Sequence, residues 1–264
     1  MPFTVTKYPQ GTFCWADVTS TDIAATTKFM TGLMDWTSKA MPTPQGPEYT
    51  MFLLGDKIVA GGAAMPPDMK GALSLWNNYV SVNNIDEMLA KAEKLGAKVA
   101  MPAMDAMDAG RFAAIQDPVG AHLFFWQPKT HIGAQIVNTV GAMGWNELYT
   151  NDMEKAMDFY GKLFGWTFDA PMKDMPGYMV IKNNGRANGG IMKITSEMTG
   201  MPVRWMVYFT VKNANETAKK VTELGGKVWD TKDIGVGNLV IISDPAGAPF
   251  FALELKMPPE EWKE

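Results

Sequence analysis

The chain has 264 residues, 47% of them hydrophobic and 20% charged, which excludes a disordered protein and suits two domains of ordinary size. Lys and Arg number 24 against 28 Asp and Glu, a formal net charge of −4 with no basic run, so we expect no nucleic-acid partner. No apolar stretch is long enough to span a bilayer and the first residues lack a signal-peptide profile, so we expect no membrane association and a cytoplasmic location.

The first half of the chain alternates between strand and helix patterns. Residues 13–19 predict a strand, and residues 22–34 carry apolar side chains at helical spacing. A second helix at Ile85–Leu95 ends at Gly96, a residue type that commonly terminates helices. The remaining predicted strands are Tyr49–Leu54, Lys57–Ala63, Leu75–Val82, Phe112–Gln116 and His122–Gln127, the last two around an Asp-Pro-Val-Gly turn.

The second half repeats the first at an offset near 130 residues. The Asp-Pro-x-Gly turn at 117–120 recurs at 244–247, so the offset drifts by only three residues, from 130 to 127. Asn151 and Glu154 indicate a capping box at the start of the repeated helix. We therefore predict a duplication into domains of residues 1–130 and 138–257. The pairs at offset 130 are Gly11/Gly141, Trp15/Trp145, Asp22/Asp152, Phe29/Phe159, Leu33/Leu163 and Trp36/Trp166.

Three repeated segments carry a resemblance to a known family. They are FYGKLFGW at 159–166 with its degenerate copy FMTGLMDW at 29–36, the LG-x-x-V segments at 95–99 and 224–228, and the DP-x-G turns. In this order, twice over, they resemble the vicinal oxygen chelate superfamily, which includes glyoxalases, bleomycin resistance proteins and extradiol dioxygenases. The resemblance implies an α+β fold of four βαβββ units, arranged as two tandem glyoxalase-like domains, each a curved mixed sheet around a cleft.

The resemblance also implies where a metal ion would bind. Metal-using members hold a divalent ion with His, Gln or Glu on the first, fourth, fifth and eighth strands of a domain. A divalent ion needs three or four anionic or imidazole donors, and none of the positions here is His, Cys, Asp or Glu. We therefore expect no metal and no other cofactor. The corresponding positions are Trp15 and Trp145, Gly61–Gly62 and Gly189–Gly190, Asn77 and Met206, and Phe124 and Phe251.

Strand alternation indicates which other side chains would share each cleft. Asp17 lies two residues after Trp15, and Glu147 two after Trp145, so each carboxyl group would face the same cleft as the indole. Burial raises the pKa of a carboxyl group, which makes Asp17 and Glu147 candidate general bases, with Arg111 a candidate to stabilise negative charge. The candidate ligand-binding residues are Trp15, Asn77, Tyr79, Phe124, Trp126, Trp145, Met206, Tyr208, Asn238 and Phe251.

Each candidate also has a purely structural interpretation. The two indoles could fill the clefts and complete the hydrophobic cores. Asp17 and Glu147 could be ion-paired or solvated at strand ends, and Arg111 could pair with an acid. His131 falls between the two predicted domains, where we expect it to be solvated, and Cys14 is expected to be a buried, inert thiol.

The sequence favours a metal-independent glyoxalase/bleomycin-resistance-like protein that binds a small apolar or aromatic molecule, with acid–base chemistry as a further step. One alternative is a metal-dependent glyoxalase-like lyase or dioxygenase with displaced ligands, using Asp17, Glu147 or His122. Another is a non-catalytic interaction or stress protein with collapsed clefts. An enzyme of this kind would be a lyase, isomerase or dioxygenase, and exposed sheet edges with Met-rich patches make a homodimer plausible.

Overall fold

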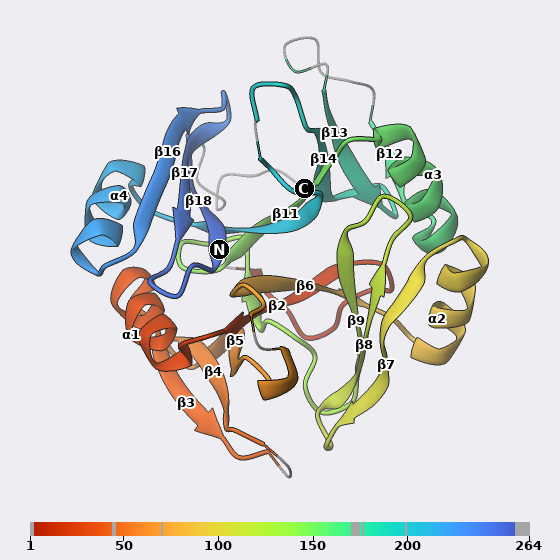
Figure 1. The fold of residues 1–264 in the computed structure, drawn as a ribbon, viewed down its shortest axis with the longest axis horizontal. Coiled ribbons are helices and arrows are strands. Elements are labelled where there is room, and N and C mark those ends of the chain that lie inside the picture. The colour runs from red at the N-terminus through yellow and green to blue at the C-terminus, as the bar shows by residue number, and fades with distance from the viewer. Residues whose placement is uncertain are drawn as a thin grey trace.

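The computed structural model describes residues 3–43, 46–69, 71–169, 175, 177–198 and 200–256. Each half of the chain forms one eight-stranded mixed sheet with two helices, which confirms the predicted α+β class (Figure 1). The first half contains β2 (Phe13–Ser20), α1 (Ile23–Met34), β3 (Thr37–Met41), β4 (Tyr49–Leu54), β5 (Lys57–Ala64), the short 3-10 helix η1 (Pro67–Met69), β6 (Leu75–Ser81), α2 (Ile85–Lys94), β7 (Lys98–Ala106), β8 (Gly110–Gln116) and β9 (His122–Pro128).

The second half repeats these elements. They are β11 (Met143–Thr150), α3 (Met153–Phe164), β12 (Thr167–Phe168), β13 (Tyr178–Asn183), β14 (Arg186–Lys193), β15 (Arg204–Thr210), α4 (Ala214–Glu223), β16 (Lys227–Asp233), β17 (Gly237–Ser243) and β18 (Pro249–Leu255). Two further short strands, β1 (Phe3–Thr4) and β10 (Ile136–Val137), pair antiparallel with each other. The segment between the halves therefore contains a strand that its sequence pattern does not predict.

Strand order is the same in both sheets. The first sheet runs β3-β4-β5-β2-β6-β9-β8-β7 and the second β12-β13-β14-β11-β15-β18-β17-β16. At the centre of each sheet the first strands of two βαβββ units pair antiparallel, β2 with β6 and β11 with β15. The two units of a half thus form one continuous curved sheet, with the predicted cleft on one face and the helices on the other.

Local signals at the helix starts agree with the structure except at one residue. The N-cap of α3 is Asp152, whose carboxylate accepts the backbone N–H of Lys155, so the predicted capping box of Asn151 with Glu154 is wrong by one position. Asp22 caps α1 in the same way, accepting from Ala25. The repeated Asp is therefore a helix-start residue in both halves.

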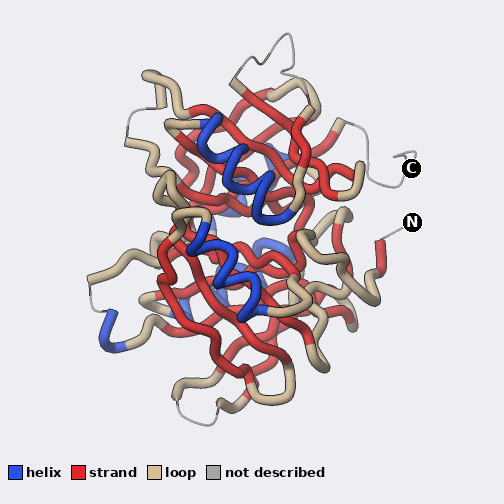
Figure 2. The backbone as a smooth tube through the Cα atoms, turned by 90° about the vertical axis from the view of Figure 1, so that its right-hand side faces the viewer, coloured by secondary structure: helices blue, strands red, loops and turns tan. Residues whose placement is uncertain are grey.

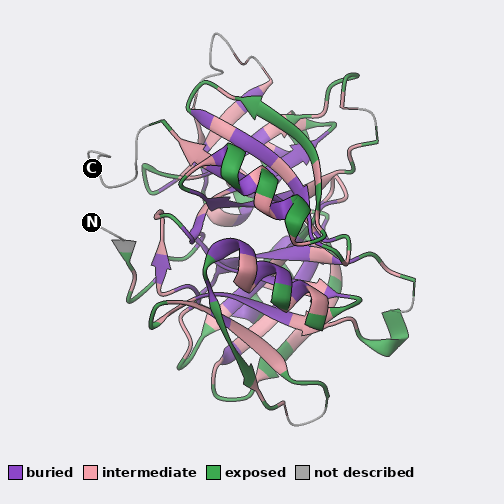
Figure 3. Cartoon of the chain, turned by 90° about the vertical axis from the view of Figure 1, so that its left-hand side faces the viewer, coloured by how far each residue is buried: buried purple, intermediate pink, exposed green. Residues whose placement is uncertain are grey.

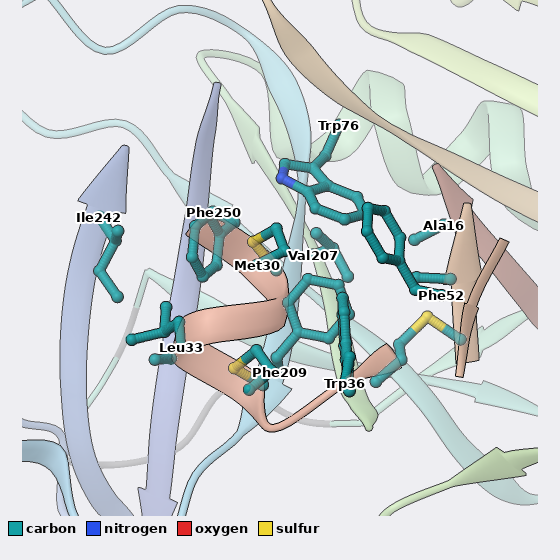
Figure 4. Close-up of a cluster of buried hydrophobic side chains, with 14 of the residues drawn as sticks. Ala16, Met30, Leu33, Trp36, Phe52, Trp76, Val207, Phe209, Ile242 and Phe250 are labelled. Carbon is teal, nitrogen blue, oxygen red and sulfur yellow. The ribbon is translucent and has the colours of Figure 1, made fainter. Parts of the chain in front are cut away.

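The two principal hydrophobic cores lie between the halves rather than inside them. One core joins α1, β4 and β5 of the first half to β15, β17 and β18 of the second; in Figure 4, Met30 and Leu33 lie beside Phe209 and Phe250. The other core joins α2, β8 and β9 to α3 and β14. The paired helices α2 and α3 stand on one flank (Figure 2), and α1 and α4 on the opposite flank, with buried residues gathered on the strands behind them (Figure 3). Each half depends on the other for its apolar burial.

Hydrogen bonds from the repeated motifs also cross between the halves. The indole N–H of Trp36 donates to the Gly141 carbonyl at 2.7 Å, and that of Trp166 donates to Gly11 at 2.8 Å. The Tyr160 hydroxyl of α3 donates to the carboxyl group of Asp117 in the first DP-x-G turn, at 2.7 Å. The motif residues that carry the family resemblance therefore build the contact between the two halves.

Candidate functional site

The first cleft contains a buried carboxyl group held by neutral donors. Asp17 is 7% exposed. Its Oδ1 accepts from the Asn77 amide at 2.8 Å, and its Oδ2 accepts from the hydroxyls of Tyr49 at 2.9 Å and Tyr79 at 3.0 Å. The expected alternatives, an ion pair or a solvated strand end, do not describe this environment. Side chains from β2, β4 and β6 instead form a closed polar cluster in an aromatic wall.

The second cleft has a related cluster around Glu147, which is 4% exposed. The hydroxyl of Tyr208 donates to Glu147 Oε1 at 2.8 Å, and the hydroxyls of Tyr149 and Tyr208 lie 3.3 Å apart. The indole N–H of Trp145 donates to the Tyr178 hydroxyl at 2.9 Å, as Trp15 donates to Tyr49 in the first cleft. The carboxyl–tyrosine–tryptophan arrangement is therefore duplicated with the fold.

Burial raises the pKa of both carboxyl groups. For Asp17 the desolvation outweighs the opposing hydrogen bonds from Asn77, Tyr49 and Tyr79. For Glu147 it outweighs the smaller effects of the surrounding tyrosine hydroxyls. Such a carboxyl group exchanges protons closer to neutral pH than an exposed one, which suits a general acid or base.

A glycine in the neighbouring strand makes room for the tyrosine in each cluster. Gly61 pairs with Asp17 across β2 and β5, and a Cβ atom there would lie 2.1 Å from the Tyr49 hydroxyl oxygen. In the second half Gly190 pairs with Glu147 across β11 and β14, and a Cβ atom on Gly190 would lie 2.3 Å from the Tyr178 hydroxyl oxygen. The fourth-strand position, which supplies a ligand in metal-using members, is thus occupied by a phenol from the adjacent strand.

The segment between the halves fills the first cleft. The Ala134 N–H donates to the Cys14 carbonyl and the Gln135 N–H to the Ile58 carbonyl, both at 2.8 Å. Tyr8 joins them by donating its hydroxyl to the Ala134 carbonyl at 2.7 Å. We call residues 131–137 the plug.

His131, at the start of the plug, is inserted between two indoles rather than solvated as expected. Its ring stands at 89° to that of Trp15, with centroids 4.8 Å apart, and at 71° to that of Trp126. Its Nε2 is buried without a hydrogen-bond partner, and burial lowers the pKa of the imidazole to about 4. The expectation of a solvated His131 was wrong because one of its ring neighbours, Trp15, lies far away in the sequence and meets it only in the folded chain.

The second cleft is open and encloses a cavity of about 560 Å³. Its walls are mainly apolar and aromatic, and Glu147 with its tyrosines lies among them. A volume of this size accommodates a drug-sized molecule. The lining residues are Gly144, Trp145, Glu147, Tyr149, Met175, Tyr178, Val180, Met192, Tyr208, Thr210, Ile234, Val236, Leu239, Leu253, Leu255 and Lys256.

Most of the residues singled out from the sequence lie in the two clefts. The first cleft brings together Trp15, Asp17, Asn77, Tyr79, Phe124 and Trp126, and the second brings together Trp145, Glu147, Met206, Tyr208 and Phe251. Cys14 is fully buried, and burial raises the pKa of its thiol, in keeping with an inert residue.

Arg111 and Asn238 do not join them. On β8 the side chain of Phe112 packs into the first cleft, so Arg111 points to the opposite face of the sheet, where its guanidinium holds both carboxylate oxygens of Asp86 at 2.7 and 3.1 Å. Asn238 similarly alternates with Leu239 of the second cleft and donates to Glu254 at 3.3 Å. The predictions that Arg111 and Asn238 face the clefts were therefore wrong, because their strand neighbours Phe112 and Leu239 occupy the cleft face instead.

Sequence reasoning missed the tyrosines Tyr49, Tyr149 and Tyr178. A usable signal exists for two of them, since Tyr49 and Tyr178 recur at an offset of 129, as do the glycines Gly61 and Gly190 that leave room for their hydroxyls. Tyr149 has Thr19 as its counterpart, so it is a difference between the halves and leaves no trace in the repeat.

The residues of the clefts do not fit the divalent metal site of metal-using relatives. In the described part of the chain, no three residues of the types His, Cys, Asp and Glu come together in a group that could hold a metal ion. Each cleft instead offers one carboxyl group surrounded by phenols and indole, and His122 is exposed at the start of β9.

Comparison with known proteins places the chain in a family. Residues 13–124 and 135–250 match the model of the Glyoxalase/Bleomycin resistance protein/Dioxygenase superfamily. The chain belongs to this superfamily. It is 40% identical over 254 residues to "Putative glyoxylase CFP32" of Mycobacterium tuberculosis, covering 94% of this chain and 96% of that one. It is 29% identical over 267 residues to "Anthracycline biosynthesis protein DnrV" of Streptomyces peucetius, covering 96% of each.

Solved structures of the superfamily share the fold at low sequence identity. The 2,3-dioxygenase LapB of Pseudomonas sp. KL28 aligns with a TM-score of 0.64 at 12% identity over 93% of both chains. The Mn(II)-bound glyoxalase of Novosphingobium aromaticivorans aligns with a TM-score of 0.62 at 11% identity over 94% of this chain and 85% of that one.

Across the described residues, no helix has the length and apolar character that crossing a membrane requires.

Proposed function

We propose that the second cleft of this superfamily member binds a small apolar or aromatic molecule without a metal ion, and that Glu147 exchanges a proton with it. The observation that carries the proposal is the 560 Å³ cavity with a buried carboxyl group in its wall. An apolar cavity with a few convergent polar groups is the usual form of a small-molecule site. The first cleft is assigned a structural role, since the plug fills it.

The acid–base part of the proposal rests on the environment of Glu147. Its carboxylate would take a proton from a carbon atom next to a carbonyl group of the ligand, and the bonding electron pair would move to the carbonyl oxygen to form an enolate. Return of the proton to the same carbon would exchange its hydrogen; with a β,γ-unsaturated ketone, return of the proton to the γ carbon of the dienolate would move the double bond into conjugation and complete an isomerisation. Once Glu147 holds the proton, the Tyr208 hydroxyl, which donates to the carboxylate at 2.8 Å, would be free to donate to the enolate oxygen.

Two alternatives receive less support. A metal-dependent lyase or dioxygenase needs a donor set that the described residues of the clefts do not provide. An interaction protein with collapsed clefts does not account for the open cavity beside Trp145. The relatives named for glyoxylase function and for anthracycline biosynthesis are compatible with a small-molecule ligand.

Binding is tested with N-phenyl-1-naphthylamine, an uncharged probe whose fluorescence rises in apolar sites, on protein stripped of metal with a chelator. We expect one probe to bind per chain. Val180→Phe narrows the cavity and should abolish binding, whereas Met51→Phe, the matching change in the filled first cleft, should not. Binding that requires an added divalent ion, or that Met51→Phe rather than Val180→Phe removes, would refute the proposal.

Proton exchange is tested by incubating the metal-stripped protein with 2-tetralone, an uncharged aromatic ketone, in deuterium oxide. We expect deuterium to enter next to the carbonyl faster than in buffer, with the acceleration lost in Glu147→Gln and kept in Glu154→Gln, an exposed carboxyl on α3. Equal exchange in wild type and Glu147→Gln would remove Glu147 from the chemistry and leave binding as the function.

A further inference from the structure

The plug occupies the first cleft, so its side chains indicate which chemical groups a cleft of this protein accommodates. In the first cleft the flat imidazole of His131 stands edge-on against Trp15. Trp15 and Trp145 are equivalent in the two sheets: each lies two residues before the buried carboxyl and donates its N–H to the equivalent tyrosine. A flat ligand ring beside Trp145 would therefore make in the second cleft the same kind of contact that His131 makes with Trp15 in the first.

The occupant of the first cleft is also uncharged at neutral pH. Burial lowers the pKa of His131 to about 4, and its Nε2 finds no partner, so the ring is held by aromatic contacts and by the backbone around it. The polar cluster of this cleft consists of Asp17 and its donors Tyr49, Asn77 and Tyr79, none of which is a cation. The packing of the first cleft thus favours neutral, flat groups.

The second cavity has no free positive charge in its described lining. Lys256 is the one basic residue there, and its Nζ lies 2.9 Å from both carboxylate oxygens of Asp233. Arg204 pairs with Tyr149 across β11 and β15 and so shares its face of the sheet, but Arg204 is not among the lining residues of the cavity. An anionic ligand would have to bury its charge near Glu147 without a counter-ion, at a high desolvation cost.

The carboxyl group of Glu147 lacks the amide donor that Asn77 gives to Asp17. Asp17 accepts three hydrogen bonds from neutral side chains, and one of the donors is Asn77. Met206 replaces Asn77 in the second half and faces Glu147 across β11 and β15, but a thioether cannot donate. The Tyr208 hydroxyl donates to Glu147 at 2.8 Å, and the hydroxyls of Tyr149 and Tyr178 also interact with this carboxyl group, so its described donors are phenols. A hydroxyl group on a ligand could supply the missing donor.

We propose that the second cleft selects uncharged, flat aromatic molecules carrying a hydroxyl group, with the ring against Trp145 and the hydroxyl donating to Glu147, and that it rejects anionic analogues. This inference rests on the proposed function of the same cleft and specifies its ligand class. The hydroxyl supplies a donor to Glu147, as the Asn77 amide does to Asp17 and as the thioether of Met206 cannot. The ring fills the place that His131 fills beside Trp15.

The test compares three probes of the same ring system at pH 7: naphthalene, 2-naphthol and 2-naphthoate, titrated against tryptophan fluorescence and checked by calorimetry. A hydrogen bond to a charged group contributes enough for 2-naphthol to bind at least about tenfold tighter than naphthalene. We expect 2-naphthoate to bind at least about tenfold weaker than 2-naphthol. Val180→Phe should remove binding of all three.

Two variants then test whether Glu147 is the residue that makes the cleft prefer 2-naphthol to naphthalene. Glu147→Gln should shrink the advantage of 2-naphthol over naphthalene several-fold, whereas Glu154→Gln, which removes an exposed charge on α3, should leave the ratio unchanged. Circular dichroism confirms folding, and the wild-type comparison stands without any variant. If 2-naphthoate binds as tightly as 2-naphthol, or 2-naphthol no tighter than naphthalene, the inference is wrong while binding in the cleft survives. If none of the three probes binds, the proposed function itself fails.

Discussion

A Cβ atom on Gly190 would lie 2.3 Å from the hydroxyl oxygen of Tyr178, so the two residues share space that only a glycine leaves free. Tyr178 uses this position to accept the indole N–H of Trp145 at 2.9 Å. The same relation holds between Gly61 and Tyr49 at 2.1 Å in the first half. A glycine on one strand thus fixes a tyrosine of the next strand in the wall of each cleft.

Gly190→Ala should displace Tyr178 and disturb the second cleft. We expect a loss of about 1–3 kcal/mol in the free energy of unfolding, as for overpacked cores, together with weaker probe binding. Gly177→Ala is the control, because a Cβ atom there makes an ordinary contact of 3.5 Å with Lys193. Urea unfolding measures both. Combining Gly190→Ala with Tyr178→Leu should cost less than the sum of the single changes, and strict additivity would contradict the shared-space explanation.

Glu147 should make stability fall as the pH rises. Burial raises its pKa above the ordinary value of 4.5, so the folded protein binds this proton more tightly than the unfolded chain. The stabilisation is complete below pH 4.5 and is lost as the pH rises through the folded pKa. Glu147→Gln removes the titration, so its melting temperature relative to wild type should increase between pH 4.5 and pH 8. A constant difference over this range would contradict the raised pKa.

Gly133→Ala should loosen the plug. Gly133 has φ +107°, and a Cβ atom there would lie 2.3 Å from the Cys14 carbonyl oxygen, so backbone strain and a backbone clash coincide. We expect a loss of more than about 2 kcal/mol of stability and faster amide exchange over residues 131–137. Gly71→Ala, at φ +92° with open space around it, carries the strain alone and should cost less. Equal losses in the two variants would argue against a tightly seated plug.

Tyr160→Phe should weaken the contact between the halves. The Tyr160 hydroxyl donates to Asp117 at 2.7 Å and accepts the indole N–H of Trp205 at 2.9 Å, so the variant leaves two buried polar groups without this partner. An unsatisfied buried group costs about 1–3 kcal/mol, and we expect about 2–4 kcal/mol in urea unfolding. A loss below about 0.5 kcal/mol would mean that water replaces the hydroxyl.

Sequence reasoning located the carboxyl groups of both clefts but not their surroundings. The two-residue alternation of a strand is reliable over short distances, so Asp17 follows Trp15 into the same cleft. Which face of β8 meets the cleft depends on its pairing with β9, and this pairing puts Phe112 inside and Arg111 outside. The plug was unpredictable for a different reason: an irregular segment such as residues 131–137 has no period, and its partners lie far away in sequence.

The duplication itself was the strongest sequence signal, and its motifs serve the fold more than the clefts. Trp36 and Trp166 donate across to the opposite half, and Tyr160 reaches the first DP-x-G turn. Residues that define the family resemblance therefore form hydrogen bonds that join the two halves. The differences between the halves, such as Met206 in place of Asn77, are what our proposal uses to tell the two clefts apart.

The most direct test of the account is a crystal structure of the metal-stripped protein soaked with 2-naphthol. We expect density for one ligand in the second cleft, with its ring against Trp145 and its hydroxyl oxygen within hydrogen-bonding distance of Glu147, while the plug keeps His131 against Trp15 in the first. A ligand seated in the first cleft with the plug displaced, or an empty second cleft at saturating 2-naphthol, would contradict it.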